Sequence, residues 1–386
     1  MYIWWTVWII AFACAIQGQA LLSSLHGHRR IIKQTSSSYT VTNMPNRFQW
    51  FNNKGYCGET SLICAGLKYG QYVSQYTVRQ TIGSQADDQV LLGINDNTAA
   101  DALHLQYVQF TSSAGNTNQF LTWVKAYILN DHPVIIGIYT NECLFHQQPG
   151  CYCGGSSSVC GDPEYDHIVP VVTIQSTDLT VPTLPPPPYP TYDSNDVITF
   201  SDNGLEGPYN NPTNSPCGPN PANPYWFSYT FDGFQNDRKQ ANNPQGQWYS
   251  LGDEVNNYAI AILGVKDLDH DTIPVTVVTN VGTSSCPSTG YLNYEFPEIV
   301  DGFNTQPAPL TLSLEVTVTI LDPSQSYHLY YYNDLAKIPD SAFNSHASDA
   351  LQSWTIAAHS GSTYQVSVTI QSDQVAAFRA VSTTAP

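Results

Sequence analysis

The sequence predicts an α+β domain followed by an all-β sandwich. Between Phe48 and about Val265 the spacing of hydrophobic residues is first helical and then extended, whereas after Asp271 only extended segments remain. The chain has 386 residues, which is more than one hydrophobic core usually serves. We therefore expect two domains, with boundaries at 46–270 and 271–386.

The N-terminus indicates a secreted, extracellular protein. Residues Ile3 to Ile16 are almost wholly apolar, and the small residues Gly18 and Ala20 stand where a signal peptidase cleaves. We interpret 1–20 as a signal peptide and 21–45 as an N-terminal extension. The alternative is an uncleaved anchor, although the apolar run is shorter than the roughly 20 residues that span a bilayer.

Composition narrows the classes of partner. The chain has 31 acidic and 13 basic residues, a formal net charge of -18, and only 11% charged residues. The negative electrostatic field of this charge repels the phosphate groups of nucleic acids and anionic lipid headgroups. Nucleic acid is therefore excluded as a partner, and so is a membrane after signal cleavage. The sequence leaves the oligomeric state open.

Three segments of the first domain have helical spacing. Cys57 to Leu67 begins directly after a glycine-containing loop, and Thr98 to Val108 follows the capping residue Asn97. Asn118 to Leu129 is the third. These segments predict helices that precede most of the sheet.

Apolar runs later in the first domain predict a central sheet. The expected strands are Val134 to Tyr139, His167 to Ile174, Val197 to Phe200 and Tyr258 to Val265. The proline-rich segment Val181 to Pro190 cannot enter a sheet interior and is expected to form a surface loop.

The C-terminal part alternates between apolar and polar residues. The alternation is clear from Leu310 to Ile320 and from Tyr364 to Ile370, and Tyr327 to Tyr332 lies between them. Strands with one buried face predict a two-layer sandwich, which we expect to contribute no catalytic group.

The cysteines divide into two groups. Of nine cysteines, Cys14 lies in the signal peptide, and Cys57 and Cys64 are too far apart along one predicted helix for a disulfide. The six others lie in polar, loop-like segments and are Cys143, Cys151, Cys153, Cys160, Cys217 and Cys286. In an oxidising compartment these six are expected to form three disulfides rather than a zinc site.

Cys57 has the context of a nucleophile. It stands where a Gly-Tyr-Cys-Gly turn opens a helix, so that the helix dipole and the N–H groups of the first turn favour the thiolate. The same N–H groups could stabilise an oxyanion. Cys64 lies inside the helix and is expected to be a buried structural cysteine, while Glu59 is expected to cap the helix.

A base and an orienting group follow in chain order. His167 opens an apolar strand after Asp166, and Asp202 and Asn203 follow a later strand. A histidine accepts the thiol proton, and a carboxylate or amide orients the imidazole. Gln49, upstream of Cys57, is a candidate donor to the oxyanion.

These residues resemble the papain-like cysteine peptidase superfamily, nearest to the bacteriocin-processing, double-glycine leader peptidase branch. The resemblance covers roughly residues 46 to 265, and it implies Cys57 as nucleophile, His167 as base and Asp202 as the orienting acid. Gln49 departs from the family pattern because it lies eight residues before the cysteine, farther than is usual. Asn52 or Asn53 is therefore an alternative oxyanion donor.

Two functions remain open at this point. The first is a secreted thiol hydrolase that cleaves peptide or isopeptide bonds in a peptide or protein substrate, without a cofactor or a metal. The second is a catalytically idle extracellular adhesion or carbohydrate-binding protein on the same fold.

The acidic run Asp267 to Asp271 lacks the glycine and glutamate of an EF-hand and is interpreted as an interdomain turn.

Overall fold

The computed structural model describes ten segments of the chain. They are residues 36–42, 44, 56–82, 95–110, 117–138, 167–201, 226–234, 257–279, 309 and 311–385. The chain divides into two compact units, Met1–Ser36 and Ser37–Pro386, and almost all of the described residues belong to the second. The expected signal peptide lies outside the described residues.

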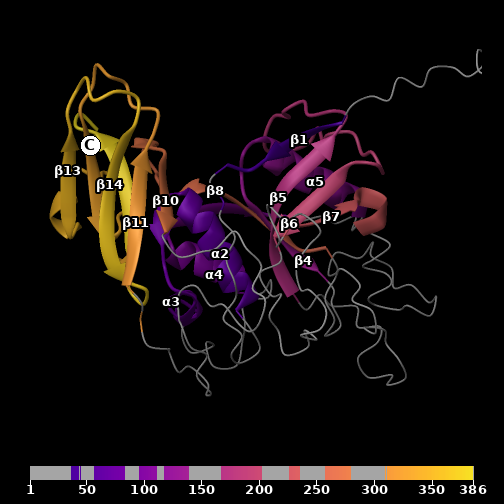
Figure 1. The fold of residues 1–386 in the computed structure, drawn as a ribbon, viewed down its shortest axis with the longest axis horizontal. Helices are drawn as coiled ribbons and strands as arrows, with labels where there is room; N and C mark the ends of the chain where they lie inside the picture. Colours follow the sequence, from indigo (N-terminus) through magenta and orange to yellow (C-terminus); the bar gives the residue numbers. More distant parts are fainter. Residues whose placement is uncertain are drawn as a thin grey trace, which may run out of the picture. The chain divides into compact units, whose positions relative to one another are not determined.

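The first part of the second unit contains a seven-stranded antiparallel sheet (Figure 1). Its order is β3-β8-β4-β5-β6-β7, and β1 pairs with β5 beyond the end of β4. The strands are β1 (Ser37–Thr40), β3 (Leu105–Gln109), β4 (Val134–Ile138), β5 (His167–Ser176), β6 (Val197–Ser201), β7 (Trp226–Thr230) and β8 (Ala259–Val265). The four strands expected from apolar runs are confirmed.

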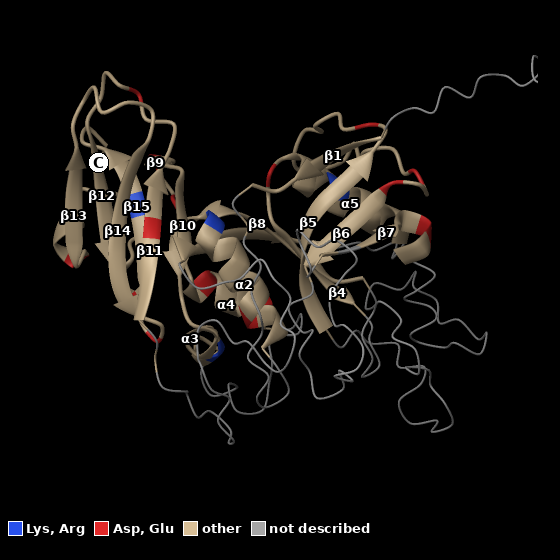
Figure 2. Ribbon diagram, viewed as in Figure 1, with Lys and Arg blue, Asp and Glu red and all other residues tan. Residues whose placement is uncertain are grey.

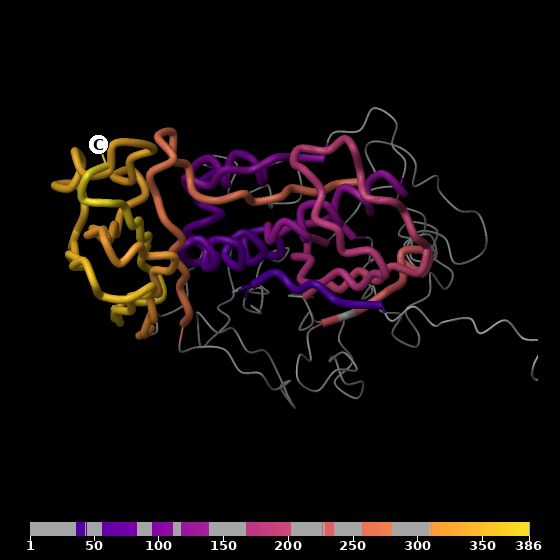
Figure 3. Tube along the Cα trace, turned by 90° about the horizontal axis from the view of Figure 1, so that it is seen from above, coloured from indigo at the N-terminus to yellow at the C-terminus, as the bar shows by residue number. Residues whose placement is uncertain are grey.

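Several helices of the described residues accompany this sheet. They are α2 (Cys57–Lys68), α3 (Gln75–Gln80), α4 (Asp96–Ala102) and α5 (Thr117–Leu129). Helix α5 packs against β1, β4, β5 and β8 and buries its apolar face there. Helix α2 contacts β5 of this sheet and also β2 and β10 of the C-terminal sheets. Figure 3 shows from above how α2, in indigo, lies between the two groups of strands.

The C-terminal part consists of two further antiparallel sheets. One has the order β10-β11-β14 and the other β13-β12-β15-β2, with β9 also paired to β15. The strands are β2 (Gln71–Tyr72), β9 (Thr272–Ile273), β10 (Val275–Thr279), β11 (Thr311–Val318), β12 (Tyr327–Tyr332), β13 (Gln352–Ile356), β14 (Tyr364–Gln371) and β15 (Ala376–Ser382). Leu312, Leu314, Val316 and Val318 are buried on one face of β11, as a sandwich requires.

The two parts share one hydrophobic core. A continuous cluster joins Leu67 of α2 and Tyr72 of β2 to Leu314 of β11 and Phe378 of β15. The change of sheet falls between Val265, the end of β8, and Thr272, the start of β9. The domain boundaries stay a prediction, but the sandwich packs on the first part through this common core.

One sequence expectation needs correction. The segment Thr98 to Val108 is not one helix, because α4 ends at Ala102 and Leu105–Gln109 forms β3, paired with β8. His104 between them has φ 53, a left-handed conformation that ends the helix and redirects the chain. Within the expected N-terminal extension, the described residues Ser37–Thr40 form β1, which pairs with β5.

Charged residues are sparse in the sheets, and most lie on helices and loops (Figure 2). Where helix α5 packs on the first sheet, the buried Lys125 is paired: its Nζ lies 2.7 Å from Asp196 Oδ2 and donates to Ser176 Oγ. Within the described segments, none of the helices has both the length and the apolarity to span a membrane.

Gly70 makes a close approach between the two parts. It has φ 74, and its carbonyl accepts a hydrogen bond from Phe378 N at 2.8 Å. A Cβ atom at this position would lie 2.9 Å from Val275 Cβ. We predict that Gly70→Ala lowers the free energy of unfolding by about 1–3 kcal/mol, through both strain and overpacking.

Gly264→Ala in β8 is the matched control, since a Cβ there meets no atom within 4 Å. Urea unfolding of both variants, followed by far-ultraviolet circular dichroism and by fluorescence, measures the difference. Equal stability of the two variants would show that the approach at Gly70 is not tight.

Candidate functional site

Cys57 is the first residue of α2, as the sequence predicts. Its side chain is reduced and only 6% exposed, and Tyr56 is the N-cap residue. The N–H groups of the first turn of a helix have no carbonyl partner within that helix and point along its axis. The sulfur is therefore carried at the positive end of a helix that is buried along its whole length.

His167 is the first residue of β5 and is 7% exposed. It lies opposite Ile138, the last residue of β4. The hydroxyl of Ser61 joins this strand to helix α2, because it donates to Cys57 O at 2.8 Å and approaches Ile168 O at 3.4 Å. The fold thus brings the first turn of α2 and the first residues of β5 to one place.

The remaining site residues lie outside the described segments. Asp202 follows directly after Ser201, the buried last residue of β6. Because β6 runs antiparallel to β5, with Phe200 opposite Val171, the end of β6 lies toward the start of β5. Asn203 and the three candidate oxyanion donors, Gln49, Asn52 and Asn53, are likewise outside the described residues.

Glu59, which the sequence suggests as a helix cap, lies in the first turn of α2 and is paired with Arg79. Its Oε1 lies 2.5 Å from Arg79 Nε, and both side chains are buried. The Arg79 guanidinium also lies 3.7 Å from the ring centre of Tyr56, and burial raises the pKa of Tyr56 to about 12. The pair with Arg79 compensates the Glu59 charge in the interior.

Sequence reasoning did not find Arg79. It lies in the short helix α3, where an arginine is ordinarily an exposed residue. Only the tertiary contact with α2 identifies it as a support for the turn that carries Cys57.

Cys64 is a buried thiol in the interior of α2, as expected. It is 1% exposed and belongs to the core formed with α5 and the first sheet. Cys57 instead belongs to the core shared with the C-terminal sheets. The six cysteines expected to form disulfides lie outside the described residues.

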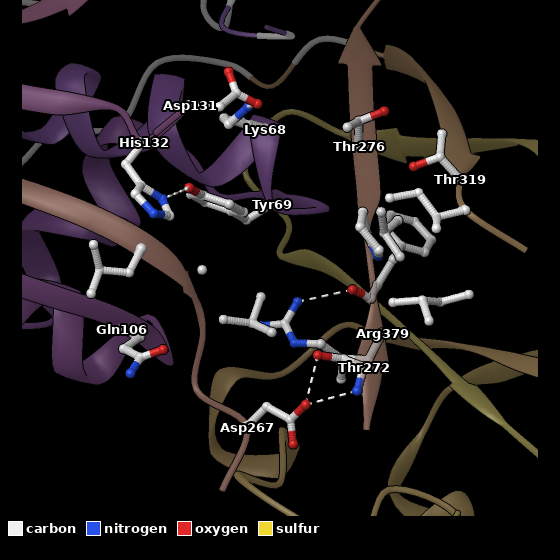
Figure 4. Close-up of a pocket in the computed structure, with 18 of the residues that line it drawn as sticks. Lys68, Tyr69, Gln106, Asp131, His132, Asp267, Thr272, Thr276, Thr319 and Arg379 are labelled. Atoms are coloured by element: carbon white, nitrogen blue, oxygen red, sulfur yellow. Dashed lines mark hydrogen bonds and ion pairs between the residues drawn. The ribbon is translucent and has the colours of Figure 1, made fainter. Parts of the chain in front are cut away.

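A cavity lies at the opposite end of α2 (Figure 4). Its volume is about 570 Å³, and Lys68 and Tyr69 at the end of α2 line it together with Asp131, His132 and Arg379. A helix of this length places the cavity roughly 18 Å from Cys57. The cavity therefore does not hold the atoms that would react at Cys57.

Most charges of this cavity are satisfied within the protein. Lys68 Nζ lies 2.7 Å from Asp131 Oδ2 and also donates to Thr42 O and Oγ1. The Lys68 ammonium, together with hydrogen bonds from Thr42, lowers the pKa of Asp131 although burial opposes this. In the acidic run, Asp267 Oδ2 accepts from Thr272 N at 2.7 Å and Asp269 Oδ2 from Ala342 N at 2.7 Å, as in a structured turn.

No group of three or more His, Cys, Asp or Glu side chains that could hold a metal ion occurs among the described residues. Comparison with protein-family models, with curated proteins and with solved structures found no match for this chain. The papain-like interpretation therefore depends on the residues themselves and on the contacts described above.

The buried pair beside Cys57 yields a prediction. Arg79→Met removes the partner of Glu59 and leaves a carboxylate in the interior, so the free energy of unfolding should fall by about 3–5 kcal/mol. The double variant Arg79→Met, Glu59→Gln should regain most of this lost stability, because no charge then remains buried at these two positions. Guanidinium unfolding monitored by fluorescence measures all three proteins.

Lys337→Met is the control, because Lys337 is exposed and its replacement should change stability by less than about 0.5 kcal/mol. If the double variant were no more stable than Arg79→Met alone, the contribution of Arg79 would come from packing rather than from compensation of Glu59.

Proposed function

We propose that this protein is a secreted papain-like cysteine hydrolase that cleaves peptide or isopeptide bonds. The observation that supports the proposal best is the contact between the first turn of α2 and the start of β5. Cys57 begins the helix, His167 begins the strand, and Ser61 Oγ bonds to Cys57 O while lying within 3.4 Å of Ile168 O. A thiol at a helix N-terminus beside a histidine is the arrangement that acyl transfer requires.

The proposed reaction proceeds through an acyl-enzyme. His167 accepts the Cys57 proton, and the thiolate attacks the carbonyl carbon of the scissile bond. The first-turn N–H groups of α2 stabilise the resulting oxyanion. The C–N bond then breaks as His167 returns the proton to the leaving amine, and a water molecule, deprotonated by His167, hydrolyses the thioester and regenerates the thiol.

Two supporting roles complete the proposal. Asp202 orients the His167 imidazole, and Asn203 is the alternative for that role. Gln49 donates a hydrogen bond to the oxyanion, with Asn52 or Asn53 as alternatives. The direction of β6, whose end at Ser201 points toward the start of β5, agrees with the role given to Asp202.

The two thiols of α2 provide an internal comparison for a test. Both Cys57 and Cys64 are buried and reduced, but only Cys57 lies at the helix N-terminus. We predict that iodoacetamide near neutral pH alkylates Cys57 at least roughly tenfold faster than Cys64, because Cys57 lies at the helix N-terminus next to the strand that His167 begins, whereas Cys64 lies in the helix interior. His167→Ala should slow alkylation of Cys57 and reduce peptide hydrolysis about 10²-fold or more.

Peptide mapping by mass spectrometry after timed labelling gives both rates in one experiment. Cys57→Ala should abolish hydrolysis of a peptide library, whereas Cys64→Ala should retain it. Equal alkylation rates for the two thiols would exclude an activated nucleophile and with it this function.

A groove in the C-terminal sandwich supports a second candidate, an extracellular carbohydrate-binding or adhesion protein. It has a volume of about 600 Å³ and is lined by Trp354 and Tyr331 with the polar residues Asn333, Gln352 and Gln374. Trp354 is half-buried, and the three polar residues are exposed. An aromatic face beside neutral amide groups suits the apolar face and the hydroxyl groups of a sugar.

For this candidate we predict that Trp354→Ala weakens retention on an immobilised neutral polysaccharide by roughly tenfold, because ring stacking is lost. Tyr107→Ala, which removes a half-buried aromatic ring of β3, should leave retention unchanged. Affinity electrophoresis in gels containing the polysaccharide measures both. Equal mobility of wild type and Trp354→Ala at every polysaccharide concentration would reject the groove as a sugar site.

A further inference from the structure

Arg379 is a buried cation whose bonding is incomplete. It lies in β15, is 1% exposed, and donates from Nη1 to Phe378 O and from Nη2 to Gln71 Oε1. A guanidinium carries five N–H donors, and Nε is among those with no acceptor in the described part of the chain.

Among the described residues, Arg379 also has no carboxylate partner. The other buried basic residues of the described segments each have one within 4.0 Å: Arg79 pairs with Glu59, Lys68 with Asp131, and Lys125 with Asp196. Arg379 is attracted by Asp267 and Asp340 but forms no ion pair with either. Burying a charge without an ion-pair partner costs free energy. An anionic ligand in the adjacent open cavity would compensate the charge of this guanidinium.

The charge of Arg379 persists at neutral pH. Burial lowers the pKa of Arg379 to about 10, and the nearby acidic groups oppose this shift. The guanidinium is therefore protonated under physiological conditions.

The cavity provides room for a ligand beside this charge. Figure 4 shows the Arg379 guanidinium extending from β15 into the ring of residues that line the 570 Å³ space. The walls combine apolar side chains, including Leu263, Ile273 and Val275, with the hydroxyls of Thr276 and Thr319. Cavities of this size and mixed lining are typical of small-molecule sites.

Two other basic groups of the wall, Lys68 and His132, do not compete for an anion. Lys68 is bonded to Asp131 and Thr42. Burial and the Lys68 charge lower the pKa of His132, so the imidazole is neutral at pH 7. Since Tyr69 Oη donates to Ile262 O, His132 Nδ1 donates its proton to Tyr69 Oη at 3.2 Å.

We propose that this cavity binds a small organic carboxylate, whose charged group pairs with Arg379 and whose alkyl part packs on Ile273 and Val275. The site lies at the far end of α2 from Cys57 and is independent of the chemistry proposed there.

Isothermal titration calorimetry of the full secreted chain tests the proposal with hexanoate as the probe. We expect saturable 1:1 binding of hexanoate, and at least about tenfold weaker binding of 1-hexanol, which has the same alkyl chain without the charge. Arg379→Gln should reduce hexanoate affinity by a similar factor. Cys57→Ala should bind as wild type does, which separates this proposal from the hydrolase proposal.

A second variant blocks the space without altering the charge. Gly264 lines the cavity, and a Cβ there meets no atom within 4 Å, so Gly264→Leu should fold normally and exclude hexanoate. Circular dichroism establishes folding of each variant. Should Arg379→Gln fail to fold, Gly264→Leu and 1-hexanol decide the question.

Three results would each overturn the proposal: no saturable binding of hexanoate at millimolar concentration, equal affinity for 1-hexanol, or unchanged hexanoate affinity in a folded Arg379→Gln or Gly264→Leu protein.

Discussion

The complete burial of helix α2 is the constraint on which the rest of the structure depends. All twelve of its residues are buried, between the first sheet on one side and the C-terminal sheets on the other. A helix without a solvent face places its polar and charged side chains in the interior, where ionised groups in particular need partners. Glu59 finds Arg79, Ser61 reaches the carbonyl of Ile168, and Lys68 finds Asp131.

These partners determine what lies at each end of the helix. At the N-terminus, Ser61 and the Glu59–Arg79 pair hold the turn that carries Cys57 against the start of β5. At the C-terminus, Lys68 and the tight approach at Gly70 join the helix to the end of α5 and to β15. The candidate nucleophile and the cavity beside Arg379 are therefore opposite ends of one rigid element.

The C-terminal sheets help to enclose α2, and they also present a surface of their own. Its strand β15 is covered along one edge by Gln71–Tyr72 and Thr272–Ile273, so that edge is not open to another chain. Tyr72 Oη donates to Ser372 O, and Gln71 links Arg379 to Leu103 O. The sandwich thus forms one wall around α2, and its core is continuous with that of the first part.

Local pattern in the sequence was sufficient for the elements with a strong period. The extent of α2 and α5, the strand opened by His167, and the alternation of β11 and β14 all follow from hydrophobic spacing, which is a property of neighbouring residues. The prediction of one helix over 98–108 was wrong because a turn at His104 interrupts the segment. A backbone reversal at a single residue leaves little trace in the hydrophobic periodicity. The strand β1 was missed because its pairing with β5 depends on residues far away in the chain.

The site was likewise predictable only in part. A cysteine at a helix start and a histidine at a strand start can be read from local context, and both positions are as expected. Local context does not reveal the ion pair of Glu59 with Arg79, the hydrogen bonds of Ser61 or the incomplete bonding of Arg379. Each depends on groups that only the packing of α2 brings together. Sequence determined which elements form, and tertiary structure decided which charges are compensated, since compensation depends on distances between residues remote in the chain.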